Sequence, residues 1–409
     1  MLRRPTMQEL SGSLRQAAIA AAQRLESAGC RTWLVGGSVR DLALGLPAKD
    51  ADLTSRATPE VIERVFEHTV PIGRPFGTML IQIEGEALEH TTFRSDEGYT
   101  DRRRPDSVRF GETPQEDAAR RDFTCNALYL DPLRDEFLDP TGGFADLEAR
   151  TLRCVGDAEQ RFSEDGLRIL RMARFAAALE LEPAPGLLEA ASSATRALEG
   201  VAGERVRDEL GKIFARRHAA RAIELLEDCG ALGKLFAPWQ GAPLEAIERA
   251  EALDAQPPAG CGLELGLALL LRRHPDALES LRPSREEREN ITGCWRLAPA
   301  LSAIAHGSRA TRIHAARSPG FELALHCTRA LDLSDAHIEA YAREIEALGP
   351  AGLHPTPLLH SEDLAQAGVP RGPAWGRILR EAETLQLDDV LPNREAALLW
   401  LAERARHSP

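Results

Sequence analysis

The sequence predicts an α+β protein in which a mixed module near the N-terminus is followed by helices alone. From Thr32 to about Arg153, short apolar runs alternate with glycine and proline turns and brief helices. Beyond about Glu159 the strand signals vanish, and the chain becomes rich in Ala, Leu, Glu and Arg at helical spacing. A chain of 409 residues is long enough for two to four modules.

The composition, 43% hydrophobic and 28% charged, is typical of a globular protein. No apolar run is long enough to span a membrane and no signal-peptide pattern follows Met1, so we expect a cytoplasmic protein without a membrane partner. The seven cysteines are widely spaced without a CxxC pair, which argues against a disulfide framework or a zinc site. The net charge of −13 disfavours a non-specific nucleic-acid binder, but it leaves open an RNA enzyme whose positive charge is local.

The predicted elements follow from spacing and from turn residues. An apolar pattern from Met7 to Ala28 predicts the first helix, which Gly29 ends. Apolar runs predict strands at 33–35, 79–83, 88–93 and 127–130, and a further strand carrying Asp50 and Asp52. Proline and glycine clusters divide the helical remainder, with boundaries near residues 155, 220 and 315.

The stretch from Trp33 to Leu53 has the features of a phosphate and metal site. Gly36 and Gly37 join the first strand to a short helix, and such a turn offers N–H groups to an anion, with Arg40 one turn further on. Asp50 and Asp52 share one strand face, where two carboxylates repel each other unless a cation such as Mg²⁺ lies between them. A tight turn and a solvated strand edge would explain each feature alone. Their occurrence within one strand–helix–strand unit favours the functional interpretation.

The same residues carry a family resemblance. Gly36-Gly37-x-Val39-Arg40-Asp41, Leu44-Gly45 and Lys49-Asp50-x-Asp52-Leu53 resemble the signature of the polymerase β nucleotidyltransferase superfamily, in the branch of class II tRNA nucleotidyltransferases and bacterial poly(A) polymerases. The resemblance is dense over the first two hundred or so residues and thinner beyond them. It implies a catalytic α/β head with a small mixed sheet (1–155), followed by an all-helical neck (156–220), body (221–315) and tRNA-binding tail (316–409) in an elongated arrangement.

The resemblance also implies a metal-dependent reaction. Asp50 and Asp52 would hold two Mg²⁺ ions, and Glu89 matches the position of a third active-site carboxylate, although a strand glutamate is otherwise often just exposed. One ion would activate the 3′-hydroxyl of the primer, and the other would neutralise the triphosphate for in-line displacement of pyrophosphate.

A ribose-binding motif is implied by Arg120-Arg121-Asp122-Phe123-Thr124-x-Asn126, which resembles the segment that the family uses beside the nucleotide sugar. The side chains of Arg121, Asp122 and Asn126 can pair with the 2′- and 3′-hydroxyls and with phosphate. The structural alternative is a capped helix start with a local ion pair.

A base-recognition motif is implied by Ser163-Glu164-Asp165-Gly166-Leu167-Arg168. Ser163 is a plausible helix cap, and the two acids would suit the positive end of a helix. Asp165 and Arg168 are three residues apart and would be neighbours on one helix face, where together they fit the amino donor and ring-nitrogen acceptor of cytosine and adenine but mispair with uracil and guanine. The family uses this motif as a protein template, so Asp165 and Arg168 are expected to select the base with support from Arg171.

Four further segments match the family in other ways. Residues 97–108 resemble a flexible loop that takes part in switching from C to A addition and is shortened in enzymes that add only C, so its presence argues against a C-only enzyme. Residues 139–147 match a hinge motif between head and neck, and the glycine and proline residues at 368–373 match part of a tail segment that cradles tRNA. In the neck motif at 203–212, Arg205 with Glu209 and Asp208 with Lys212 are predicted to be surface pairs with spacing i,i+4.

We therefore expect a template-independent nucleotidyltransferase that adds C and A to the 3′ end of tRNA from CTP and ATP, with no protein partner. An A-adding enzyme that completes CC-ended tRNA would have the same motifs and stays open, as does a CC-adding enzyme. A poly(A) polymerase is disfavoured because the chain is acidic and has no basic tail. A non-catalytic tRNA-binding protein is disfavoured because a decayed site would be expected to have lost one of its two aspartates.

Overall fold

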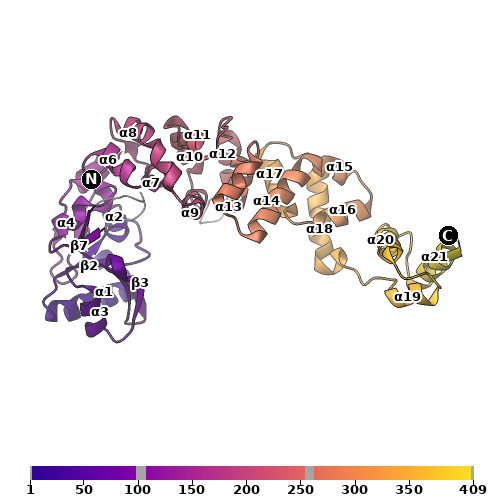
Figure 1. Cartoon of the computed structure of the whole chain (residues 1–409), viewed down its shortest axis with the longest axis horizontal. Coiled ribbons are helices and arrows are strands. Elements are labelled where there is room, and N and C mark those ends of the chain that lie inside the picture. The colour runs from indigo at the N-terminus through magenta and orange to yellow at the C-terminus, as the bar shows by residue number, and fades with distance from the viewer. Residues whose placement is uncertain (1, 98–106, 254–261, 407–409) are drawn as a thin grey trace. The chain divides into compact units, whose positions relative to one another are not determined.

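The computed structural model describes residues 2–97, 107–253 and 262–406. The chain forms two compact units, Met1–Leu244 and Glu245–Pro409 (Figure 1). The finer division into head, neck, body and tail stays a prediction. Within the described ranges, the helices are too short or too polar to cross a membrane.

A seven-stranded mixed sheet forms the base of the first unit, in the order β3-β4-β5-β2-β1-β8-β9. The strands are β1 (Thr32–Val35), β2 (Leu53–Ser55), β3 (Thr69–Gly73), β4 (Thr78–Ile83), β5 (Glu86–Thr92), β8 (Tyr129–Leu130) and β9 (Phe137–Leu138). Strands β2 and β5 pair in parallel and the other neighbours are antiparallel. All four residues of β1 are buried, so the strand that leads into the glycine turn lies in the core.

Helices and short elements cover this sheet and join it to the helical region. They are η1 (Met7–Glu9), α1 (Gly12–Ser27), α2 (Gly37–Ala43), α3 (Pro59–Val65), η2 (Arg74–Phe76), α4 (Pro114–Ala119), η3 (Thr124–Asn126) and α5 (Gly143–Glu148). Strands β6 (Arg94–Glu97) and β7 (Ser107–Phe110) form a separate antiparallel pair. Helix α1 packs against β1 and β5, as its apolar stripe requires.

The helical part of the first unit is built around α7 (Leu167–Ala178), which packs on α9 (Gly203–Phe214) and α10 (Ala219–Asp228). The other elements are α6 (Ala158–Glu164), α8 (Leu187–Ser193), η4 (Thr195–Gly200) and α11 (Ala231–Leu235). One face of α7 is buried through Ile169, Leu170, Ala173 and Ala176, which fixes the direction of its arginines.

The described residues of the second unit form helices joined by loops, without strands. Its elements are α12 (Leu244–Leu253), α13 (Leu263–Leu270), η5 (Pro275–Leu281), α14 (Arg285–Leu297), η6 (Ala298–Ala300), α15 (Leu301–Ala305), α16 (Arg309–Ala316), α17 (Phe321–Ala330), α18 (Ala336–Leu353), α19 (Ser361–Gln366), α20 (Pro373–Leu387) and α21 (Arg394–Arg406). The glycine and proline segment at 368–373 is the predicted loop between α19 and α20, with Pro373 opening the second helix.

The α+β class and the small mixed sheet are confirmed, but four local predictions were wrong. The first predicted helix is divided into η1 and α1, and the predicted strand at 127–130 is reduced to β8. The strand after the glycine turn begins only at Leu53, where pairing with β1 and β5 becomes possible, so Asp50 and Asp52 precede it. The region beyond Glu159 contains a two-residue strand, β11 (Glu182–Pro183), because the proline break leaves the chain extended beside β10 (Thr151–Leu152).

Buried ion pairs join the end of the sheet region to the helices. The Asp122 carboxylate, which is 8% exposed, accepts a hydrogen bond from Arg171 Nε of α7 at 2.8 Å. Glu209 of α9 is buried and pairs with Arg174 of α7. Burial alone would raise the pKa of Asp122, but Arg171, Asn126 and the Phe123 N–H outweigh it and hold that pKa at about 2, below the usual 3.8.

Helix α5 packs so closely on η3 that there is no room for a side chain at Gly143. A Cβ atom on Gly143 would lie 2.0 Å from the carbonyl oxygen of Thr124 in η3. The contact is reinforced by Thr124 Oγ1, which donates to Asp146 Oδ2 at 2.7 Å. The residues at 139–147, predicted as a hinge, therefore support η3 directly.

We predict that Gly143→Ala destabilises the protein by about 1–3 kcal/mol, because the new methyl group meets backbone atoms that cannot rotate away. The measurement is the free energy of unfolding in urea. Gly12→Ala is the matched control, since a Cβ at Gly12 has no neighbour within 4 Å. Equal stabilities of the two variants would contradict the observed packing of α5 on η3.

We also predict that acid destabilises the protein partly through Asp122. Because its pKa is lowered on folding from 3.8 to about 2, its stabilisation is complete above pH 4 and is lost as the pH falls through that interval. The expected loss is about 2 kcal/mol. Urea unfolding between pH 7 and pH 2 should show a shallower decline in Asp122→Asn than in Glu67→Gln, which removes an exposed carboxylate. Parallel declines would contradict the assignment.

Candidate active site

The glycine turn at the end of β1 is flanked by two guanidinium groups. Gly36 has φ +78°, a conformation that favours glycine, and its N–H donates to the Leu128 carbonyl oxygen at 3.3 Å. The first intrahelical bond of α2 runs from Arg40 N–H to the Gly36 carbonyl oxygen, so the N–H groups of Gly37, Ser38 and Val39 open the helix without a partner within it. A Cβ on Gly36 would lie 3.4 Å from Arg121 Nη1, and one on Gly37 would lie 3.6 Å from Arg40 Nη2. Backbone N–H and two arginines thus meet at one place, which suits a phosphate chain.

A continuous side-chain network connects this turn to α7. Arg40 Nη1 donates to Asn126 Oδ1 at 2.6 Å, and Asn126 Nδ2 donates to Asp122 Oδ1 at 3.1 Å. Asp122 Oδ2 accepts from Arg171, as described above. The structure therefore brings together four of the residues that the sequence singles out in three separate motifs.

An aromatic ring lies inside this network. The guanidinium carbons of Arg40 and Arg171 are both 5.2 Å from the centroid of the Phe175 ring, and that of Arg174 is 4.0 Å away. Phe175 also packs edge-on against Phe123 of the ribose motif, with 5.7 Å between ring centroids. Cation–π contacts of this kind help to hold like-charged arginines close together. The guanidinium groups also donate to carboxylates, Arg40 to Asp41, Arg171 to Asp122 and Arg174 to Glu209.

The predicted metal ligands occupy neighbouring elements. Asp50 and Asp52 lie in the segment that leads into β2. The carbonyl oxygen of Asp52 accepts a hydrogen bond from the Val35 N–H of β1 at 3.0 Å. Glu89 is on the exposed face of β5, opposite the buried His90, as the alternation of the sequence predicts. Asp50 is exposed and Asp52 is half-buried.

Electrostatics couple these three carboxylates. Burial, then Asp50 and Glu89, raise the pKa of Asp52 to about 7, and Arg121 opposes the rise. Burial and Asp50 also raise the pKa of Glu89. In the part of the chain that the structure describes, no three His, Cys, Asp or Glu side chains lie close enough to form a ready-made metal cage. The donor set nevertheless fits a divalent cation, because hard carboxylate oxygens repel one another where a positive ion would stabilise them.

The two predicted base-recognition residues do not pair with each other. Asp165 lies between α6 and α7, and its carboxylate accepts from Leu167 N–H at 3.1 Å and from Arg205 Nη2 at 2.8 Å. Arg168, on the first turn of α7, donates to Glu164 Oε2 at 2.6 Å. Ser163 was wrongly predicted as a helix cap, because α6 continues through it and Gly166 precedes α7.

Several supporting residues were missed by sequence reasoning. The predicted pairs of Arg205 with Glu209 and of Asp208 with Lys212 are not the ones formed, since Arg205 turns to Asp165 and Lys212 pairs with Glu209 at 3.2 Å. Asp117 and Tyr129 bind Arg121, and Arg174 binds Glu209. Among these pairs, Asp117 with Arg121 and Glu209 with Lys212 have a sequence signal, namely the i,i+4 and i,i+3 spacings.

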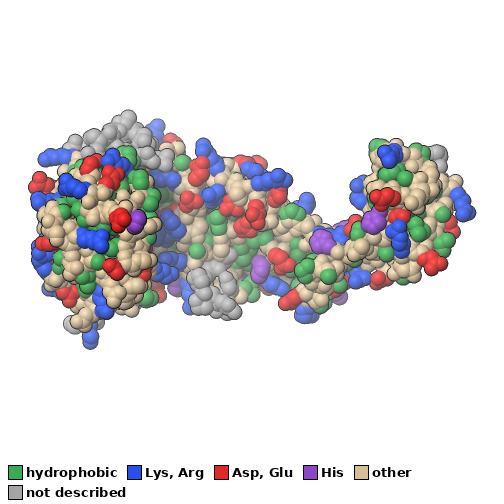
Figure 2. Space-filling model, turned by 90° about the horizontal axis from the view of Figure 1, so that it is seen from below, with side chains coloured by type: hydrophobic (Ala, Val, Ile, Leu, Met, Phe, Trp, Pro, Cys, Tyr) green, Lys and Arg blue, Asp and Glu red, His purple; other side chains and the backbone are tan. Residues whose placement is uncertain are grey.

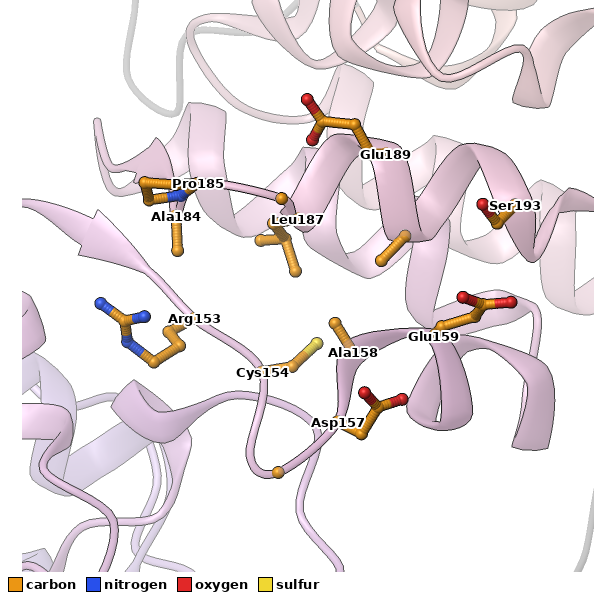
Figure 3. A pocket seen from close by; sticks show the side chains of 13 residues that line it. Arg153, Cys154, Asp157, Ala158, Glu159, Ala184, Pro185, Leu187, Glu189 and Ser193 are labelled. Carbon is orange, nitrogen blue, oxygen red and sulfur yellow. The ribbon is translucent and has the colours of Figure 1, made fainter.

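Other predicted features lie away from this network or outside the residues that the structure describes. Most of the predicted loop, residues 98–106, lies outside the described residues. The six cysteines within the described residues are free and buried. A cavity of about 430 Å³ between α6 and α8 (Figure 3) is lined by Arg153, Cys154 and Asp157 among others, and none of the predicted site residues contributes to it.

Comparison with known proteins identifies the two halves of the first unit. Residues 32–153 match the family model for the poly A polymerase head domain. Residues 180–240 match a model described as the probable RNA and SrmB-binding site of polymerase A. The first match contains the glycine turn, the carboxylates and the ribose motif, and the second begins after α7.

Full-length relatives and solved structures extend the match across both units. The CCA-adding enzyme of Levilactobacillus brevis is 33% identical over 385 residues, covering 92% of this chain and 94% of the relative. That of Lactobacillus johnsonii is 31% identical over 393 residues, covering 93% and 95%. The crystal structure of the Bacillus stearothermophilus CCA-adding enzyme in complex with CTP superimposes with a TM-score of 0.78 at 27% identity, covering 97% of this chain and 98% of that one. The chain therefore belongs to the CCA-adding enzyme family of nucleotidyltransferases.

Proposed function

We propose that this chain adds C and A residues to the 3′ end of tRNA from CTP and ATP, completing the CCA sequence and releasing pyrophosphate. The observation that carries this proposal is the network from Arg40 through Asn126 and Asp122 to Arg171. It joins the glycine turn to α7, which follows Asp165 and carries Arg168 on its first turn. With tRNA and nucleotides as substrates, the enzyme is expected to act in the cytoplasm.

Different residues of the network would bind different parts of the nucleotide. Gly37 N–H, Arg40 and Arg121 would bind the triphosphate, since they converge at the glycine turn. Asp122 and Asn126 would accept and donate hydrogen bonds at the ribose hydroxyls. Arg171 fixes the Asp122 carboxylate against α7 and so sets the distance from ribose to base.

Membership of this family implies a divalent metal, which we propose to be Mg²⁺ held by Asp50 and Asp52 with Glu89 nearby. When bound in a two-metal arrangement, Mg²⁺ would activate the 3′-hydroxyl of tRNA and neutralise the triphosphate. The mutual repulsion of the three carboxylates is the cost that the cation offsets.

Base selection is assigned to Asp165 and Arg168. The Asp165 carboxylate accepts three hydrogen bonds from Leu167 and Arg205, which leaves one of its roughly four acceptor positions for the amino group of cytosine or adenine. Arg168 would donate to the adjacent ring nitrogen. A carbonyl in place of the amino group, as in uracil or guanine, would face a carboxylate that only accepts.

The relatives favour complete CCA addition over its variants. Both full-length relatives are CCA-adding enzymes, and one solved relative is the Thermotoga maritima enzyme complexed with tRNA. An A-adding enzyme remains the second candidate, because it would use the same network. On the face seen in Figure 2, basic and acidic side chains are interspersed over both units, unlike the continuous basic surface expected of a sequence-indifferent poly(A) polymerase.

The decisive experiment supplies single nucleotides to two tRNA substrates, one ending at the discriminator base and one ending in CC. The prediction is two C residues added to the first from CTP alone, one A added to the second from ATP alone, and negligible use of UTP or GTP. The products are resolved on a sequencing gel. An A-adding enzyme would leave the shorter tRNA unextended with CTP, which would contradict CCA addition.

The control for this assay is Asp52→Ala. It should reduce incorporation to background because a metal-binding carboxylate is lost, while tRNA binding measured by filter retention stays nearly unchanged. Retained incorporation would refute the role assigned to Asp52.

A further inference from the structure

A buried carboxylate behind the glycine turn has no role in the reaction described so far. Asp117 of α4 is fully buried, at 0% exposure, although burying a charge is costly. Its oxygens receive five hydrogen bonds from only three side chains. Oδ1 accepts two from Arg120, and Oδ2 accepts from Arg121 Nε at 2.9 Å, Arg121 Nη2 at 2.8 Å and Tyr129 Oη at 2.8 Å.

These contacts fix the plane of the Arg121 guanidinium. Two of its three nitrogens are held by one oxygen of Asp117, and its carbon lies 5.5 Å from the centroid of the Tyr129 ring. The third nitrogen, Nη1, donates to the Asn126 carbonyl oxygen at 3.3 Å. This orientation places Nη1 against Gly36, within 3.4 Å of the point where a Cβ would stand.

The charges of the cluster do not cancel. Two guanidinium groups converge on one carboxylate, so Asp117, Arg120 and Arg121 together carry one net positive charge in a largely buried setting. An apolar group of similar size would stabilise the fold at least as well as this ion cluster, so stability alone does not explain it. Arg121 also interacts with the Asp52 carboxylate, and an anion at the glycine turn would be a further negative neighbour.

We propose that Asp117 is a positioning residue for nucleotide binding, which orients Arg121 toward the triphosphate of CTP and ATP alike. The inference rests on the proposed function, because it needs a triphosphate at the glycine turn. It assigns Asp117 no contact with the nucleotide itself. Its effect is expected on the affinity for any triphosphate and not on the choice of base.

The chain offers a matched control for the loss of a buried carboxylate. Asp131, at the other end of β8, is also fully buried and pairs with two arginines, Arg31 at 2.8 Å and Arg134 at 3.1 Å. It belongs to none of the motifs at the site. Asp117→Asn and Asp131→Asn therefore make the same chemical change at two buried carboxylates that each pair with two arginines, although the arginines around Asp131 are more exposed.

The experiment measures steady-state extension of tRNA at varied CTP and ATP, together with the Kd of each nucleotide without tRNA in the presence of Mg²⁺. Asp117→Asn should raise KM and Kd about tenfold for both nucleotides and leave kcat within about twofold. The ratio of the Kd for CTP to the Kd for ATP should stay unchanged. Asp131→Asn should lower thermal stability without changing KM or Kd. Equal nucleotide affinities in the two variants, or a loss confined to kcat, would overturn the proposal.

Tyr129→Phe provides a second test in case Asp117→Asn does not fold. It removes one donor to Asp117 and keeps the ring, so KM and Kd should rise about threefold. An unchanged Kd in this variant would count against the proposal. Nucleotide binding without addition to tRNA would refute the proposed function and still test Asp117, whereas a wild-type chain that binds neither nucleotide would overturn both.

Discussion

The ion pair between Asp122 and Arg171 is the interaction on which the arrangement of the site depends. It is the point where the loop after α4, which carries the predicted ribose motif, meets α7, which follows Asp165 and carries Arg168. Asn126 and Arg40 connect this ion pair to the glycine turn, and the buried face of α7 fixes the position of Arg171. A small change in this pair would alter the distance between the triphosphate and the base.

Several like-charged arginines lie close together at this junction, and the surrounding residues offset their repulsion. Arginines from the sheet region and from α7 gather around one phenylalanine ring, where cation–π contacts and buried carboxylates offset their repulsion. Glu209 accepts from Arg174 of this group while buried, and Asp117 accepts from the neighbouring Arg120 and Arg121. Arg40, Arg171 and Arg174 thus each have a carboxylate partner, whereas Arg120 and Arg121 share Asp117 beside the glycine turn.

The residues that come together at the candidate site could be predicted from the sequence because they reside in local motifs, whereas their roles stay a prediction. The glycine turn, the ribose motif and the α+β division were visible as spacing and residue type, and Arg40, Asn126, Asp122 and Arg171 come together in the structure. Long-range pairing was not visible. The partner of Asp165 is Arg205, 40 residues away, and nothing in the sequence distinguishes that arginine from a surface residue. The extent of the strand at Leu53 was likewise set by its neighbours β1 and β5, and no local propensity indicates where pairing begins.

The central claim is that one nucleotide spans the network from the glycine turn to the start of α7. The most direct measurement is a crystal structure of the chain with CTP and Mg²⁺. We predict that the triphosphate lies at Gly37 and Arg121 and the ribose at Asp122 and Asn126. The edge of the cytosine is expected to contact Asp165 and Arg168. A triphosphate at the glycine turn with its cytosine directed away from α7 would contradict it.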